Sequence, residues 1–325
     1  MNALVEFKQV KRVFQVRNPA TILGGKLDLR AVQDVSFSIA PGQTLGLVGE
    51  SGCGKSTVGQ LVLGLLPPSD GEILFDGAPL TADPKDPAWR AHRRDMQMIF
   101  QNPYGALNPR LTIGRQMREV LDTHEIGGLE ERDDRVVALM RSVGLEPHIQ
   151  DRYPHQMSGG QLQRVVIARA LAVSPRFLVC DEAVAALDVS IQAQVVNLLQ
   201  DIQEERNLTY LFISHDLEIV RHVSDRIVIM YLGRVMETGD AQAVFENPRH
   251  PYTRALMAAA PHPEPGRRKE EPPLEGDPPS PINPPSGCMF RTRCRYAQPA
   301  CGEVVPEPVV IGEDHVVACI RSQEI

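Results

Sequence analysis

The residues GESGCGKST occupy positions 49–57 and match the pattern G-x-x-x-x-G-K-[ST]. The apolar run at residues 44–48 comes directly before them and is typical of a buried strand. Residues 58–66 follow and predict a helix, which Pro67-Pro68 terminates. A strand, a glycine-rich loop and a helix in this order form a phosphate-binding loop, because the glycines let backbone amides point inward and the helix presents its positive end to the same anion.

The polar side chains of this loop have expected contacts. Lys55 is expected to reach the β- and γ-phosphates of a nucleotide, and the Ser56 hydroxyl to ligate Mg²⁺. An ordinary glycine-rich turn is the alternative, and the agreement of strand, loop, Lys-Ser pair and apolar helix disfavours it. The residues expected to bind nucleotide here are Gly49, Ser51, Gly52, Cys53, Gly54, Lys55, Ser56 and Thr57.

The composition is that of a globular protein with one large domain and a smaller one. Of the 325 residues 42% are hydrophobic, and 34 basic against 41 acidic side chains give a net charge of −7. The lack of a basic excess argues against a nucleic-acid partner. No run of about 18 apolar residues occurs, and the N-terminus lacks the apolar stretch of a signal peptide. We therefore expect the chain to stay in the cytosol and to reach a membrane through a partner.

Residues 4–40 alternate apolar and polar side chains and predict antiparallel strands, with a loop from Asn18 to Gly25 between them. Phe14 lies in this region among basic residues. Its spacing favours a role in the core of a strand, and the functional alternative is a ring that stacks on a nucleobase.

Three apolar segments that predict buried strands end at polar side chains. They are residues 96–100 before Gln101, 177–180 before Asp181 and Glu182, and 209–214 before His215. Ligands of open α/β sheets gather outside the carboxyl ends of strands. Asp181 suits a Mg²⁺ shell, Glu182 suits a general base acting on water, and His215 can reach a γ-phosphate. The alternatives are a solvated acidic turn and a structural histidine.

The sequence Ser158-Gly159-Gly160-Gln161 begins a second apolar helix, expected at residues 165–173. Its serine and glycines make this helix start a second candidate for binding an anion. The chain thus has two candidate anion-binding sites, and a dimer would explain why one chain needs both. Residues 111–150 and 190–205 are also expected to be helical, and residues 226–231 and 234–237 to form a hairpin.

The amino-acid composition changes in the C-terminal part of the chain. Ten of the 27 prolines lie in residues 261–285, which predicts an extended linker. Beyond it, Cys288, Cys294, Cys301 and Cys319 form a C-x5-C-x6-C-x17-C array. Four thiolates can hold zinc or an iron–sulfur cluster, although the spacing matches neither the usual zinc nor the usual ferredoxin pattern. Free thiols and disulfides are the alternatives, and Arg291, Arg293 and Arg295 would offset the charge of a metal centre.

These motifs, taken together and in this order, resemble those of the ATPase subunits of ABC transporters. The set consists of residues 49–57, Gln101, residues 158–161, Asp181-Glu182, Asp188 and His215. The segments 101–110, 190–195 and 247–253 and the Pro-rich, Cys-containing tail further resemble the ATPases of oligopeptide/dipeptide importers, with the F-type subunit as the best match. The resemblance covers essentially the whole chain.

The resemblance implies a role for each matching residue. Phe14 would stack on adenine, against the preference from its spacing. Ser56, Gln101 and Asp181 would hold Mg²⁺, with Glu182 as general base, Gln101 also at the attacking water and His215 at the γ-phosphate. Ser158, Gly160 and Gln161 would bind ATP held by the opposite subunit of a head-to-tail dimer, and Asp188 would lie at the dimer contact. The tail of some relatives holds a [4Fe-4S] cluster.

The family implies an α/β fold: a P-loop NTPase core with an antiparallel β subdomain and an α-helical subdomain. We expect an ATPase domain at residues 1–260 (helical subdomain about 103–172), a linker at 261–287 and a C-terminal extension at 288–325. The implied partners are a homologous second ATPase, two transmembrane permeases and an extracytoplasmic binding protein, with the chain at the cytoplasmic face of the bacterial inner membrane.

Two departures from the family pattern are conservative. Met157 replaces a commoner leucine, and Ala183-Val184 replace Pro-Thr, so that no catalytic group is lost. The leading function is ATP-driven import of di- or oligopeptides. The alternatives are the same machinery importing nickel, glutathione or an antimicrobial peptide, a catalytically silent partner subunit, and a non-transport ABC ATPase acting on ribosomes or DNA.

Overall fold

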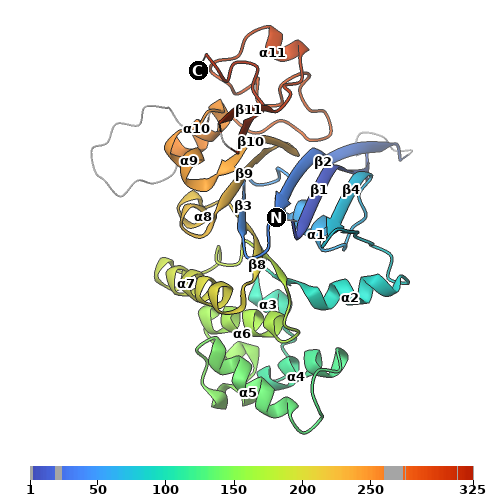
Figure 1. Cartoon of the computed structure of the whole chain (residues 1–325), viewed down its shortest axis with the longest axis vertical. Helices are drawn as coiled ribbons and strands as arrows, with labels where there is room; N and C mark the ends of the chain where they lie inside the picture. Colours follow the sequence, from blue (N-terminus) through green and yellow to red (C-terminus); the bar gives the residue numbers. More distant parts are fainter. Residues whose placement is uncertain (1–2, 19–23, 260–273, 275, 313, 325) are drawn as a thin grey trace. The chain divides into compact units, whose positions relative to one another are not determined.

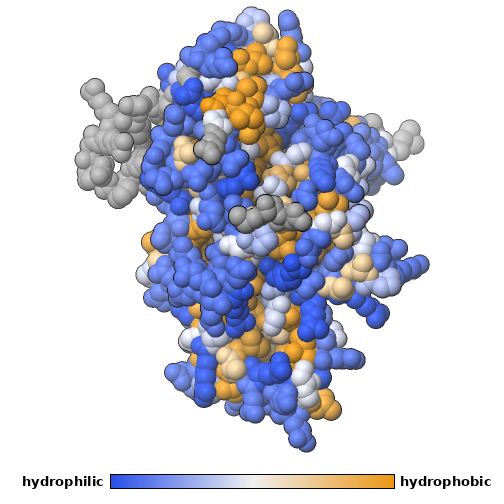
Figure 2. Space-filling view, viewed as in Figure 1, coloured by the Kyte–Doolittle hydropathy of each residue, from blue (hydrophilic) through white to orange (hydrophobic). Residues whose placement is uncertain are grey.

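The computed structural model describes residues 3–18, 24–259, 274, 276–312 and 314–324. The chain divides into two compact units, which are described separately. Unit 1 combines Met1–Leu80 with Ser214–Ile325, and unit 2 is Thr81–Ile213. Charged and polar residues cover most of the visible face of each unit (Figure 2). Within the described residues, no helix combines the length and apolar character needed to span a membrane.

Unit 1 contains the antiparallel sheet predicted for the N-terminal region, with strand order β2-β1-β4-β5 (Figure 1). Its strands are β1 (Val5–Arg17), β2 (Lys26–Ile39), β4 (Asp70–Phe75) and β5 (Ala78–Pro79). The long β1 and β2 strands pair from Val5 opposite Ile39 to Arg17 opposite Lys26. The intervening loop falls mostly on residues 19–23, outside the described residues.

A second group of strands in unit 1 carries the phosphate loop. Its order is β11-β12-β10-β9-β3, where β3 (Thr44–Val48) is parallel to β9 (Arg226–Tyr231). The predicted hairpin is confirmed, because β9 continues into the antiparallel β10 (Arg234–Asp240). The C-terminal strands β11 (Val309–Gly312) and β12 (His315–Val317) extend the sheet, since β12 pairs with β10.

Helix α1 (Lys55–Val62) follows the phosphate loop and differs from the expected span of 58–66. It begins at Lys55 because Gly54, with φ of 110°, turns the loop directly into the helix. It ends early in a Schellman motif, in which Gly64 has φ of 60° and Leu65 N–H donates to the Gln60 carbonyl. The other helices of unit 1 are α8 (Leu217–Val223), α9 (Ala241–Glu246), α10 (Pro251–Ala259) and α11 (Ala300–Glu303).

Unit 2 combines three parallel strands with a group of helices. The strand order is β8-β7-β6, with β6 (Met96–Ile99), β7 (Phe177–Asp181) and β8 (Thr209–Ser214), whose last residue begins the second part of unit 1. The helices are α2 (Pro87–Asp95), α3 (Pro103–Ala106), α4 (Ile113–Thr123), α5 (Arg132–Ser142), α6 (Gly159–Leu171) and α7 (Val189–Arg206), with 3₁₀ turns η1 (Pro147–Asp151) and η2 (Pro154–Gln156).

The helical prediction for residues 111–150 is only partly right. Glu125 and Gly127 have positive φ and end α4, and Gly144, with φ of 70°, ends α5 before Pro147 starts a 3₁₀ turn. The chain therefore doubles back twice. Helices α4, α5 and α6 lie together at one end of the unit (Figure 1).

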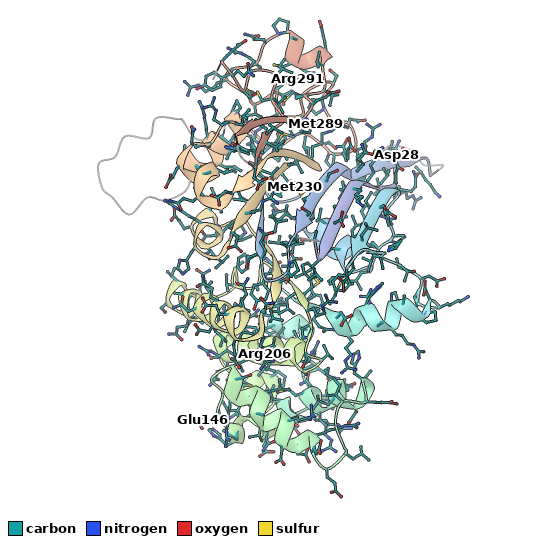
Figure 3. All side chains as sticks on the ribbon, in the orientation of Figure 1. Asp28, Glu146, Arg206, Met230, Met289 and Arg291 are labelled. Atoms are coloured by element: carbon teal, nitrogen blue, oxygen red, sulfur yellow. The ribbon has the colours of Figure 1, made fainter. Side chains whose placement is uncertain are left out.

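The predicted Pro-rich linker at residues 261–287 lies partly outside the described residues, which resume at Leu274 and from Gly276 onward. Residues 276–287 contain no helix or strand. The following Cys-containing region includes Met289 and Arg291, both of which are labelled in Figure 3.

Candidate functional site

The phosphate loop of unit 1 needs glycine at two positions. A Cβ atom on Gly49 would lie 2.2 Å from the Met230 carbonyl oxygen on β9. Gly54 has φ of 110°, and a Cβ there would lie 2.3 Å from the Ala31 carbonyl oxygen on β2. Carbonyl oxygens from both sheets of unit 1 thus lie close to the loop, and only residues without a Cβ atom leave room for them.

Lys55 spans this loop from the first turn of α1. Its side chain is buried, and Nζ donates to the Gly49 carbonyl at 2.7 Å and to the Glu50 carbonyl at 3.0 Å. Cys53 is buried as well, and burial raises the pKa of its thiol although the nearby Lys55 lowers it. Ser51, Gly52 and Ser56 are exposed and Thr57 is half-buried. The side chains of Cys53 and Lys55 therefore lie on the buried side of the loop, and those of Ser51 and Ser56 are accessible to a ligand.

Phe14 lies in β1 opposite Leu29 of β2. Its side chain is half-buried, and the Arg12 guanidinium lies 4.6 Å from the ring centroid. It is thus not a fully buried core residue, and its ring already packs against a flat cation.

The carboxylates of unit 2 follow β7. Asp181 is the last residue of that strand, and Glu182 has a left-handed backbone with φ of 48°. The Glu182 N–H donates to the Ile213 carbonyl at 2.9 Å, so the strained residue is held at the end of the sheet. The Gln101 amide Nε2 donates to Glu182 Oε2 at 2.7 Å. The structure therefore brings Gln101 and Glu182 together, although 81 residues separate them.

A capping box forms at the start of α6 in unit 2. Ser158 Oγ accepts from the Gln161 N–H at 3.3 Å, and Gln161 Oε1 accepts from the Ser158 N–H at 3.1 Å. A Cβ atom on Gly160 would lie 2.6 Å from Cγ2 of Ile191 on α7. Asp188 is exposed at the N-cap of α7. Gly160 therefore has a packing role in addition to the predicted one.

His215 follows β8 and is exposed. The next residue, Asp216, caps α8 by accepting from the N–H groups of Glu218 and Ile219. The predicted nucleotide residues are thus divided between the units: unit 1 contains Phe14, the phosphate loop and His215, and unit 2 contains the others.

The four C-terminal cysteines line one cavity of about 20 Å³ in unit 1, together with Arg291 and Arg321. Each is a free thiol, so the disulfide alternative is not seen. Burial raises the pKa of Cys294 to about 11, and burial and neighbouring thiols raise those of Cys288 and Cys319. Among the described residues, no group of three or more His, Cys, Asp or Glu side chains has the geometry of a metal-ion site.

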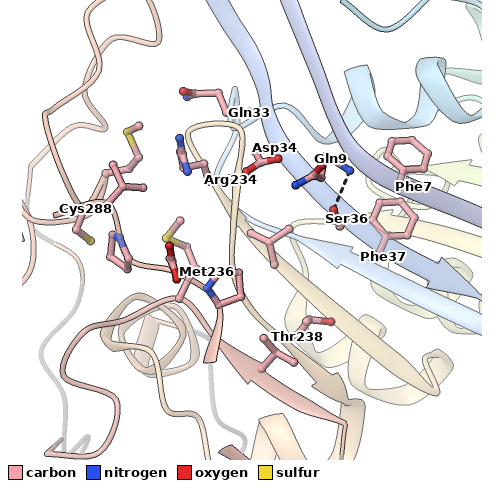
Figure 4. A pocket seen from close by; sticks show the side chains of 18 of the residues that line it. Phe7, Gln9, Gln33, Asp34, Ser36, Phe37, Arg234, Met236, Thr238 and Cys288 are labelled. Carbon is pink, nitrogen blue, oxygen red and sulfur yellow. Dashed lines mark hydrogen bonds between the residues drawn. The ribbon is translucent and has the colours of Figure 1, made fainter. Parts of the chain in front are cut away.

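Two features of unit 1 were not predicted. The first is an ion pair between Arg293 and Glu50 of the phosphate loop. The sequence predicted instead that Arg293 would offset the charge of a metal centre at the cysteines. The second is a cavity of about 780 Å³ between the β2-β1-β4-β5 sheet and β10 (Figure 4). The stacked rings of Phe7 and Phe37 and the side chain of Arg234 line it. No local sequence signal announces either feature, because each joins segments far apart in the chain.

Comparison with known proteins defines the class. A family model described as ABC transporter matches residues 32–185, and one described as the C-terminal region of oligopeptide/dipeptide transporters matches residues 236–301. The solved structure of cbiO1 from Clostridium perfringens, part of the ABC transporter complex cbiONQ, is 28% identical with a TM-score of 0.64, covering 76% of this chain and 92% of that chain. A dimeric ATP-binding cassette in a post-hydrolysis state with ADP and Pi is 30% identical, also with a TM-score of 0.64, covering 73% and 98%.

Curated relatives narrow the class. The oligopeptide transport ATP-binding protein AppF of Bacillus subtilis is 46% identical over 97% of this chain and 96% of its own length. The proteins named OppF are 48% identical in Haemophilus influenzae (98% and 97% covered) and 52% identical in Escherichia coli (90% and 88% covered). The chain belongs to the ABC transporter family of ATP-binding proteins, in the branch with the oligopeptide/dipeptide transporter C-terminal region. The predicted family, α/β P-loop fold and ATPase activity are thereby confirmed.

Proposed function

We propose that this chain is the ATP-hydrolysing subunit that powers import of di- or oligopeptides through an ABC transporter. The observation that carries the proposal is the similarity to oligopeptide transport ATP-binding proteins over nearly the whole chain, including the C-terminal region. The family model described as ABC transporter matches residues 32–185, and the match of residues 236–301 to the oligopeptide/dipeptide transporter C-terminal region goes beyond it.

Nucleotide binding is assigned first to the residues of unit 1. Phe14, whose ring also contacts the Arg12 guanidinium, stacks on adenine, and the amides of residues 49–57 surround the phosphates. Lys55, which already bridges two carbonyls of the loop, neutralises the β- and γ-phosphates. His215 contacts the γ-phosphate.

Hydrolysis is assigned to residues of unit 2. Glu182 accepts a proton from the attacking water, whose oxygen then bonds to the γ-phosphorus as the bond to ADP breaks. The hydrogen bond from Gln101 and the left-handed backbone fix the direction of this carboxylate. Bound Mg²⁺ supplies charge neutralisation at the phosphates, and Ser56, Gln101 and Asp181 carry the oxygen atoms suited to hold it.

Other residues act in the dimer of ATPase chains and in the complete transporter. Ser158, Gly160 and Gln161 bind ATP held by a homologous second ATPase chain in a head-to-tail dimer, and Asp188 lies at that dimer contact. The dimer works with two transmembrane permeases and an extracytoplasmic binding protein, as a peripheral protein at the cytoplasmic face of the bacterial inner membrane. The net charge of −7 supports the absence of a nucleic-acid partner.

The four cysteines that line one cavity are proposed to bind a metal centre, with a [4Fe-4S] cluster as the expected occupant. The backbone N–H groups of Gln298 and Arg321 donate to the sulfur atoms of Cys301 and Cys319 at 3.4 Å, and hydrogen bonds to sulfur are a feature of iron–sulfur sites. Iron and acid-labile sulfide should copurify under anaerobic conditions and be lost in Cys294→Ser. Zinc without sulfide would correct the identity of the centre, and a colourless, metal-free protein would refute it.

The experiment that tests the transport function is ATP hydrolysis by the complete transporter in vesicles. The binding protein is supplied empty, loaded with short peptides, or loaded with a nickel chelate. Stimulation by peptide alone is expected. Stimulation by nickel alone would overturn the proposed cargo, and no response to either would count against both cargoes and favour another substrate or a silent subunit.

A further inference from the structure

The C-terminal region reaches the phosphate loop through one buried ion pair. Arg293 donates from Nη1 to Glu50 Oε2 at 2.6 Å and from Nη2 to Glu50 Oε1 at 3.0 Å. This is the two-pronged geometry in which a guanidinium holds a carboxylate most firmly. The side chain of Arg293 is 5% exposed and that of Glu50 24%, so the guanidinium is shielded from water and the carboxylate is partly shielded.

Glu50 also contacts other parts of the loop and α10 through its backbone. Its N–H donates to the Tyr252 hydroxyl of α10 at 3.0 Å. Its carbonyl accepts from Lys55 Nζ at 3.0 Å and from the Cys53 N–H at 3.3 Å. A displacement of Glu50 would therefore move the lysine that neutralises the phosphates and the amides that surround them.

Arg293 is itself held in place by aromatic side chains. Its Nη1 lies 3.4 Å from the Tyr231 hydroxyl, and Tyr231, Tyr252 and Phe290 pack with ring centroids 4.7 to 5.4 Å apart. The hydrogen bonds to Glu50 raise the pKa of Arg293, which stays charged at any working pH.

The same short segment also belongs to the cysteine-lined cavity. Cys288, Phe290 and Cys294 line that cavity, and Arg293 directly precedes the last of them. A second stretch of the C-terminal region, Pro278–Pro281, lines a cavity of about 220 Å³ with residues 50–53 of the phosphate loop. A change of conformation around the cysteines would thus reach the loop with no intervening element.

We propose that Arg293 is a positioning residue for ATP binding: through Glu50 it holds the phosphate loop in its binding conformation and makes ATP affinity depend on the state of the segment 288–294. Loss of the guanidinium leaves the half-buried Glu50 carboxylate without its partner, and the loop rearranges to solvate it more fully. The inference rests on ATP binding at this loop, which the proposed function requires.

The test measures ATP affinity in the complete transporter with a fluorescent ATP analogue, together with KM and kcat for ATP hydrolysis. Arg293→Met should raise Kd and KM about tenfold, with kcat at saturating ATP much less affected. Arg293→Lys keeps the charge without the two-pronged contact and should fall between wild type and Arg293→Met. Arg141→Met is the matched control, since that exposed arginine lies in the last turn of α5 in unit 2, and it should leave Kd unchanged.

A double-mutant cycle with Glu50→Gln separates positioning from a general structural role. Arg293→Met combined with Glu50→Gln should weaken ATP binding no more than the worse single variant. Additive effects, or a lower Tm with an unchanged Kd in Arg293→Met and Arg293→Lys alike, would overturn the inference. Failure of the wild-type complex to bind ATP would instead overturn the proposed function.

Discussion

His250 at the start of α10 is expected to make the protein less stable in mild acid. Its ring is 1% exposed, Nδ1 accepts from the Tyr252 N–H at 3.0 Å, and the Phe290 ring lies 6.0 Å away. Burial lowers the pKa of His250 to about 4, even though the Glu237 carboxylate favours the charged form. In the unfolded chain the same histidine has a pKa of about 6.5.

The sign and size of the effect follow from this difference. Because the folded pKa is depressed, the unfolded chain takes up a proton below about pH 6.5 that the folded chain refuses until about pH 4, so stability falls across that interval. The full loss is about 3 kcal/mol, and about 1.4 kcal/mol of it is reached by about pH 5.5. For a chain of 325 residues this corresponds to a decrease in Tm of about 2 °C.

Glu237 titrates outside this interval. Burial by itself would raise its pKa, but hydrogen bonds from His315 and from the backbone N–H groups of Arg249 and His250 outweigh it and leave the pKa below its ordinary value. Its contribution is therefore present above about pH 4.3 and is lost only as the pH falls further, through its folded pKa.

The assay is thermal unfolding at about pH 7.5, 6.5 and 5.5. His250→Asn keeps an acceptor for the Tyr252 N–H but cannot titrate, so its Tm should fall less than that of wild type between the highest and lowest pH. His155→Asn removes an exposed histidine and should behave like wild type. An equal pH dependence in wild type and His250→Asn would refute the reasoning.

Three further predictions concern unit 2. Glu182→Gln should reduce ATP turnover by the complete transporter about 10²–10⁴-fold with ATP still bound, and near-normal turnover would exclude Glu182 as the base. Gly160→Ala should destabilise the chain by about 1–3 kcal/mol in urea unfolding, because its Cβ meets Ile191 at 2.6 Å, and the added change Ile191→Ala should restore part of the loss. Gln163 is 0% exposed, and within the described residues neither atom of its amide has a hydrogen-bond partner, so Gln163→Leu should raise the unfolding free energy by about 1–2 kcal/mol; a lower Tm would contradict this.

Much of the local structure could be predicted because its signals lie within a few residues of one another. The phosphate loop is a strand, a glycine-rich turn and a helix in direct succession. The capping box of Ser158 and Gln161 joins residues three apart, and the hairpin of β9 and β10 joins adjacent strands. Helix ends were less predictable, since α1 ends at a glycine-based motif that the apolar pattern runs past.

The sequence by itself determined the family and the P-loop fold, and it supplied the prediction of which residues bind nucleotide, because these depend on residue types at fixed short spacings. Only the tertiary structure decided that Gln101 holds Glu182 across 81 residues and that Arg293 turns from the cysteines to Glu50 across 243. Such pairs depend on how distant strands and loops pack. Which partner each of these half-buried carboxylates meets is decided by the packing of the folded chain, which local propensities do not describe.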